Sequence, residues 1–144
     1  MTTPELFFAI RPETPLRAAR AEDHERIDRM LAANPQNWSD EDVDVVMSRT
    51  QTTIGGPETF KWILPAFLDR CLANPERGWM TDSNDLVSKL DYAHFDNWPA
   101  DQQRAALAML NNWANAWSRL HAGDITDSAD DDAVLRNWLK ARSI

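Results

Sequence analysis

The segment 57–72, with the sequence PETFKWILPAFLDRCL, constrains the fold more than any other part of the chain. Its apolar residues recur at intervals of three and four, the spacing that places side chains on one face of an α-helix. No stretch of useful length alternates apolar and polar residues as a half-buried strand does, and only four glycines are present. The sequence therefore predicts an all-α protein with this segment at the centre of its core.

At about 100° per residue, one broad side of this central helix carries six apolar residues. They are Phe60, Ile63, Leu64, Phe67, Leu68 and Cys71. Trp62 lies nearly opposite, so either the helix is packed on two sides and Trp62 is core, or Trp62 belongs to a partner-binding surface. Pro65 removes one intrahelical hydrogen bond and clashes with the carbonyl four residues earlier, which predicts a kink or a break into two helices.

Helix start and stop signals divide the rest of the chain into further helices, and the whole of 1–144 is expected to form one compact domain of six or seven helices. The expected segments are 4–10, 15–33, a helix that Ser39 caps, a helix that Asp82 opens, the long helix 99–121 and a helix that Ser128 opens. The long helix presents a buried stripe and is expected to pack against the segment 57–73 at the centre. Its stripe is Ala106, Leu110, Trp113, Trp117 and Leu120, and the last helix would dock through Val134, Leu135, Trp138 and Leu139. No internal repeat is expected.

The charge balance narrows the class of partner. Twenty-three acidic against fifteen basic residues give a net charge of −8, which disfavours phosphate backbones and anionic lipid. We therefore expect no nucleic acid and no membrane, and a basic protein is the partner that the charge favours. The lone Cys71 cannot form an intrachain disulfide, and no secretory or membrane-spanning run is present, which is typical of a cytoplasmic protein.

A search for catalytic and metal-binding patterns predicts no catalytic residue, no metal and no cofactor. His24, His94 and His121 are far apart, and none has a histidine or cysteine at metal-ligand spacing. Cys71 falls on the apolar side of the central helix, as a small buried hydrophobe does. Two acidic clusters, 40–44 and 124–132, lack the alternating ligands and turn glycine of a calcium loop and lie where helix starts favour negative charge.

The loop 74–82 is the best place in the sequence for a contact surface. It places Trp79 and Met80 beside carboxylates, and loops on rigid helical scaffolds often carry binding residues. The candidate partner-binding residues are Trp62, Trp79, Met80, Asp82 and Asp85. For Trp79 the alternative is that its ring plugs the end of the core.

Two motifs carry a resemblance to a known family. Pro-Glu-x-Phe at 57–60 is followed by Leu-Pro-Ala-Phe-Leu at 64–68, and Phe95-x-x-Trp98 is followed by Gln103-Arg104-x-Ala106. In this order, over residues 55–110, they resemble a bacterial family of small proteins that is a domain of unknown function. The chain departs from the family's pattern at Trp98, where phenylalanine is more frequent. The resemblance implies a bacterial helical protein and assigns no catalytic residue.

Three hypotheses about function follow. The first is a non-enzymatic acidic helical protein that binds another protein, for example an immunity or antitoxin-like inhibitor of a basic toxin. The second is a small-molecule-binding or sensing module whose tryptophans line a cavity between helices. The third is an enzyme whose carboxylates and histidines converge only in the folded chain.

Overall fold

The computed structural model describes part of the chain, and the all-α prediction is confirmed there. The described residues are 25, 30, 33–51, 54, 56–74, 77–120 and 127–142, without the side chains of 117–120 and 127–132. They form η2 (Pro35–Asn37), α3 (Asp40–Arg49), α4 (Pro57–Ala73), α5 (Ser83–Tyr92), η4 (Phe95–Asn97), α6 (Ala100–Leu120) and α7 (Asp127–Arg142). The expected helices 4–10 and 15–33 lie outside these residues, apart from positions 25 and 30, which are helical.

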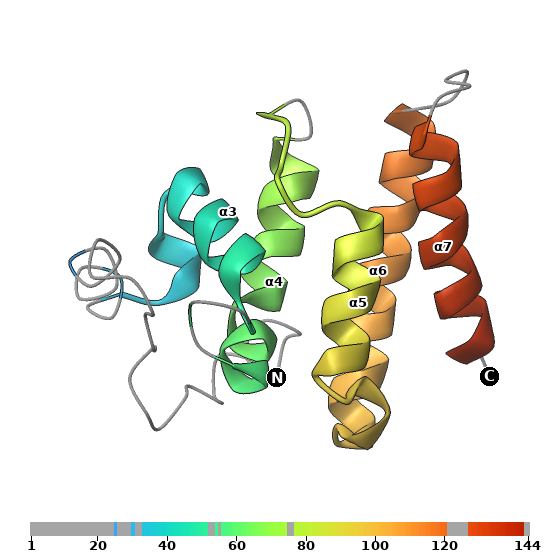
Figure 1. Ribbon diagram of the computed structural model, residues 1–144, viewed down its shortest axis with the longest axis horizontal. Helices are drawn as coiled ribbons and strands as arrows, with labels where there is room; N and C mark the ends of the chain where they lie inside the picture. The colour runs from blue at the N-terminus through green and yellow to red at the C-terminus, as the bar shows by residue number, and fades with distance from the viewer. Residues whose placement is uncertain are drawn as a thin grey trace.

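The helices are arranged in two layers. In Figure 1, α3 lies in front of α4 and α5 lies in front of α6, while α4, α5, α6 and α7 alternate in direction. Helix α4 packs against α3, α5 and α6, and α7 packs against α5 and α6. Helix α4 is therefore covered from two sides, and it packs on the long helix as the sequence predicts. None of the helices in the described ranges combines the length and the apolar character that crossing a bilayer requires.

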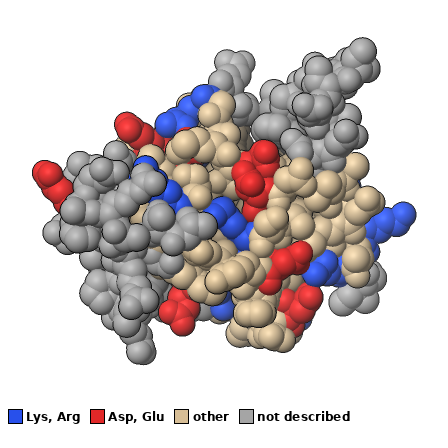
Figure 2. Space-filling model, in the orientation of Figure 1, with Lys and Arg blue, Asp and Glu red and all other residues tan. Residues whose placement is uncertain are grey.

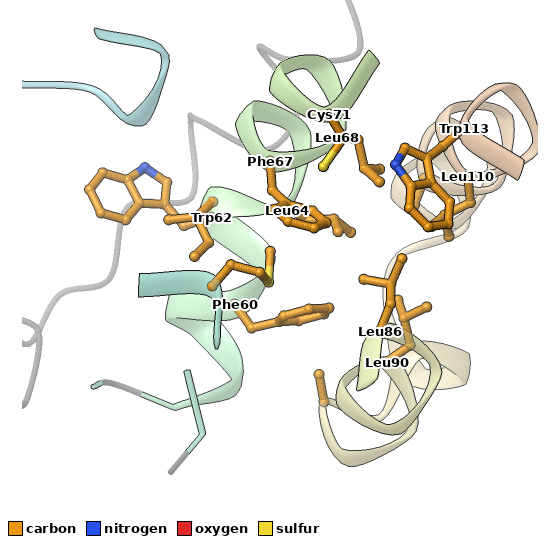
Figure 3. Packing of buried hydrophobic residues seen from close by; sticks show 14 of the residues in the cluster. Phe60, Trp62, Leu64, Phe67, Leu68, Cys71, Leu86, Leu90, Leu110 and Trp113 are labelled. Carbon is orange, nitrogen blue, oxygen red and sulfur yellow. The ribbon is translucent and has the colours of Figure 1, made fainter. Parts of the chain in front are cut away.

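The two-sided packing explains the sequence of α4. Trp62 is 1% exposed and meets the Trp38 ring edge-on, with 5.5 Å between the ring centroids. Figure 3 shows Trp62 pointing away from the side on which Phe60 and Leu64 face α5 and α6. A helix between two packing partners has no face left for solvent over most of its length, so a full ring of apolar residues is needed.

Pro65 lies inside α4 and is buried. Of the two predicted outcomes, the break does not occur, because α4 is one helix from Pro57 to Ala73. Burial on both sides stabilises the helical conformation of the residues that flank Pro65, and this offsets the hydrogen bond that proline cannot make.

Most of the predicted caps and buried stripes are found. Ser39 Oγ accepts from the backbone N–H of Asp42 at 3.1 Å, and Asp82 Oδ1 accepts from that of Asp85 at 2.8 Å. The buried members of the predicted stripes are Ala106, Leu110, Trp113, Leu135, Trp138 and Leu139. Val134 is 37% exposed, so its predicted docking role is wrong. The side chains of Trp117 and Leu120 lie outside the described residues.

One turn recurs three times in this fold. In each copy a tryptophan indole N–H donates to the carbonyl oxygen five residues earlier, at 3.0 to 3.2 Å: Trp38 to Ala33, Trp79 to Asn74 and Trp98 to Ala93. For Asn74 and Ala93, the C-caps of α4 and α5, the bond satisfies a carbonyl at the end of a helix, and in each copy another helix begins after the tryptophan. The three tryptophans stand 41 and then 19 residues apart, so the turn has no fixed period and does not define an internal repeat of the chain.

Candidate functional site

The structure divides the five predicted partner-binding residues between the core and the surface. Trp62 is buried on the side of α4 that faces Trp38. Its assignment to a binding surface is therefore corrected, because the packing of α3 and η2 on α4 covers it. Trp79 is half-buried and rests edge-on against Phe67 at 5.9 Å, as a plug of the core would. Met80, 54% exposed, is the large side chain that this loop presents to solvent.

A buried carboxylate holds this loop in place. Asp44, on α3, has a side chain only 3% exposed, and it accepts from the guanidinium of Arg77 and from the backbone N–H of Met80 at 3.0 Å. The Arg77 guanidinium in turn lies 4.8 Å from the centre of the Trp79 ring. Gly78 has φ of +78°, a conformation that glycine adopts without strain. Met80 is therefore exposed on a loop whose backbone is fixed by side chains of the scaffold.

An open pocket lies between the end of α3 and one face of α5. It has a volume of about 350 Å³ and is lined by Ser48, Thr50, Gln51, Asp85, Ser88, Lys89 and Tyr92. Positions 85, 88, 89 and 92 fall on one face of α5 by their helical spacing. The Tyr92 side chain, 62% exposed, stands at the far end of α5 from Met80. We call this set of seven residues the α3/α5 pocket.

Lys89 ties the two walls of the α3/α5 pocket together. Its ammonium group donates to the carbonyl oxygens of Thr50 at 2.9 Å and Ser48 at 3.4 Å, at the C-terminal end of α3. A cation there complements carbonyls that lack helical partners. Burial lowers the pKa of Lys89 from its ordinary value, and the nearby Asp85 carboxylate opposes that shift.

Gln51 combines an unusual backbone with an unsatisfied side chain. Its φ is +67°, in the left-handed region that non-glycine residues rarely adopt. Its amide nitrogen donates to the carbonyl oxygen of Lys89 at 3.0 Å, and its amide oxygen can act only as an acceptor. That oxygen is buried and has no hydrogen-bond partner among the described residues. The left-handed backbone carries strain on the order of 1–3 kcal/mol. The amide oxygen is enclosed, so it does not open to the pocket.

Of the lining residues only Asp85 was predicted. The spacing of Asp85, Ser88 and Tyr92 shows that they share a face of α5, but the sequence does not say that this face borders α3. Gln51 and Ser48 carry no sequence signal, because their place in the pocket depends on where α3 ends relative to α5. The cavity contains no tryptophan among its described lining residues, unlike the cavity of the small-molecule hypothesis.

Charges of both signs surround the site. Figure 2 shows acidic and basic side chains interspersed over the described part of this face, with no single sign covering it. Two acidic residues of the 40–44 cluster have structural partners: Asp40 pairs with Arg70 at 2.8 Å, and Asp44 holds the loop. Side-chain hydrogen bonding to Arg70 lowers the pKa of Asp40. The side chains of the second cluster, 124–132, lie outside the described residues.

The other residues considered for chemistry do not converge at the pocket. His94 is exposed in the turn after α5 and does not line it, while His24 and His121 lie outside the described residues. In the described part of the chain, no group of three or more histidine, cysteine or acidic side chains is placed to hold a metal ion.

Cys71 is buried in α4, and burial raises the pKa of its thiol to about 12. The thiolate is the reactive form, so we expect a thiol reagent at pH 7.5 to modify the folded protein at least about 100-fold more slowly than the urea-unfolded protein. Absorbance of the released reagent measures both rates. Equal rates in the two states would show that Cys71 is accessible and would contradict its place in the core.

Comparison with family models, with curated proteins and with solved structures gives no match to this chain. The resemblance carried by the two motifs remains a prediction. The proposal about function rests on the geometry of the surface around α5.

Proposed function

We propose that this protein is a non-enzymatic binding module that recognises another polypeptide, preferably a basic one, through the outer face of α5. The observation that carries the proposal is the presentation of two large exposed side chains, Met80 before α5 and Tyr92 at its end, with an open pocket along the face of α5 from Asp85 to Tyr92. An immunity or antitoxin-like inhibitor of a basic toxin is one protein of this class, and the cytoplasm is the proposed compartment.

Three features support a polypeptide as the ligand. Methionine and tyrosine are side chains that protein interfaces favour: the flexible thioether adapts to the partner, and the tyrosine ring buries much apolar area with few rotatable bonds. The loop before α5 is anchored by Asp44, so little ordering entropy is lost when a partner docks on Met80. The net charge of −8 and the exposed Asp85 favour encounter with a basic segment.

The experiment is a selection of displayed random peptides on the immobilised full chain, followed by binding measurements on the synthesised winners. We expect the selected peptides to share an excess of lysine and arginine beside an apolar residue. Their affinity should fall as salt is raised from about 50 to 300 mM, because exposed charge pairs are screened.

Paired variants test the surface. Asp85→Asn and Met80→Ser should each weaken binding by at least about fivefold, a loss of roughly 1 kcal/mol. Glu58→Gln and Val134→Ser remove the same kind of charge and exposed apolar group elsewhere, on α4 and α7, and should leave binding unchanged. Selected peptides that bind equally well to all four variants, or a selection without any shared pattern, would refute the proposal.

A further inference from the structure

The C-terminal end of α7 holds the end of α5 through two carboxylates. The Trp138 indole N–H donates to Asp91 Oδ1, in the last turn of α5, at 2.9 Å. The Arg142 guanidinium donates from Nε and Nη2 to the two carboxylate oxygens of Asp96, in η4, at 3.0 and 3.1 Å. Two parallel bonds fix the orientation of both groups, because the fork of a guanidinium matches the two oxygens of a carboxylate.

Ring contacts join these bonds into one network. The Arg142 guanidinium lies 4.0 Å from the centre of the Trp138 ring, and its Nη2 lies 3.7 Å from Asp91 Oδ1. The Trp138 ring packs against the Phe95 ring of η4, with 4.9 Å between the ring centroids. An ion pair with two parallel bonds and a stacked ring holds its geometry better than an isolated pair on the surface.

Tyr92 lies between the two held carboxylates in the sequence. It follows Asp91 as the last residue of α5, and the chain then turns through His94 into η4. The φ of His94 is +57°, a left-handed conformation that persists in a residue other than glycine where surrounding contacts hold it. The contacts of α7 with Asp91 and Asp96 therefore hold the backbone on both sides of Tyr92.

We infer that Arg142 is a positioning residue for Tyr92, because it fixes the backbone from which the exposed tyrosine ring projects toward a partner. This inference rests on the proposed function, in which Tyr92 is one of the two large exposed side chains of the binding surface. Asp44 of α3 fixes Met80 in the same way, so each end of the surface is held by a different helix. Side chains whose backbone is fixed before binding lose less conformational entropy when a partner docks.

The test uses the fact that Tyr92 is the only tyrosine in the sequence, so 3-fluorotyrosine places a single fluorine reporter there. Arg142→Gln in the full chain should shift or broaden the fluorine NMR signal of Tyr92. It should also speed hydrogen exchange at the backbone amides of Ala93 and His94, which donate to carbonyls of α5, by at least about tenfold. Exchange at the Met80 amide should not change, because Asp44 holds that end from α3.

Three further variants separate positioning from a general loss of stability. Asp96→Asn removes the other half of the paired contact at a side chain that is 69% exposed, so the fold is kept, and it should reproduce the changes of Arg142→Gln. Arg142→Lys should not restore the parent signal, because an ammonium cannot form two parallel bonds. Arg136→Gln is the matched control, since it removes the same charge from an exposed residue of α7 that bonds to Ala114 and Asn115 of α6. It should leave the fluorine signal and the exchange rates unchanged.

Binding completes the test. Peptides selected on the α5 surface should bind Arg142→Gln at least about threefold more weakly than the parent chain. An unchanged fluorine signal in Arg142→Gln, or an equal change in Arg136→Gln, would overturn the inference. If selected peptides bind Arg142→Gln as tightly as the parent, the positioning role is wrong and the proposed function stands. If Arg142→Gln alters the Tyr92 signal and no peptide is selected, the positioning of Tyr92 stands and the proposed function fails.

Discussion

Replacing Leu64 with alanine should lower the free energy of unfolding by about 2–5 kcal/mol. Leu64 is fully buried on α4, among the side chains that face α5 and α6 (Figure 3). The loss of stability has two parts. One is the favourable free energy of removing the deleted groups from water, and the other is the cost of the cavity that remains because the helices cannot close it completely. Urea unfolding at constant pH measures it, and because roughly 1 kcal/mol corresponds to 2–4 °C at this size, the melting temperature should fall by about 5–15 °C.

Leu72→Ala is the matched control, since it makes the same substitution in the same helix at a side chain that is 40% exposed. Its expected cost is within about 0.5 kcal/mol, the range of ordinary surface changes. Trp113→Ala should resemble Leu64→Ala, because Trp113 is 3% exposed on α6 and faces the same core. A melting temperature within a degree of the parent for either core variant would show that α4 and α6 do not pack as described.

Asp44→Asn should cost about 2–4 kcal/mol and should also free the loop before α5. The asparagine keeps the size of the side chain, but its amide nitrogen would face the Arg77 guanidinium, and the charge that Arg77 now pairs with would be gone. The backbone N–H of Met80 would lose its charged acceptor as well. We expect faster hydrogen exchange at the Met80 amide and weaker binding of the peptides that the α5 surface selects.

Arg77→Met provides the complementary variant. It leaves the Asp44 carboxylate, whose side chain is 3% exposed, without its partner cation, so it should cost at least as much as Asp44→Asn, and the double variant should cost less than the sum of the two. Additive costs, or unchanged exchange at Met80 in Asp44→Asn, would mean that the carboxylate does not anchor the loop. Asp85→Asn removes an exposed carboxylate from the first turn of α5, so it should alter peptide binding at a cost in stability of no more than about 1 kcal/mol.

Much of the helical framework could be predicted because its causes are local. Ser39 and Asp82 cap helices in the manner that their neighbours in sequence predict, and the spacing of Ala106, Leu110 and Trp113 marks the buried side of α6. Such patterns depend on residues one to two turns apart, so they can be read without knowing what packs where. The prediction for Val134 is wrong because it uses spacing alone. The spacing places Val134 beside the buried residues of α7, but the packing of α7 decides how wide the buried side is, and Val134 lies outside it.

The candidate site could be predicted only in part. Met80 and Asp85 were found from the composition of one loop and the start of one helix. Gln51 and Lys89 lie 38 residues apart and meet because α3 ends beside α5. Nothing in the sequence around either residue signals the other, so the pocket could not have been foreseen.

By itself, the sequence determined that the described chain is helical, where most of its described helices begin, and most of the side chains that they bury, since all three follow from backbone geometry and the avoidance of water by apolar groups. Only the tertiary structure decided that Trp62 is covered, that Asp44 fixes Met80, and that Gln51 meets Lys89 where α3 ends beside α5. These features depend on contacts between segments that are far apart in the sequence. The packing of helices on both sides of α4 sets the positions of those segments.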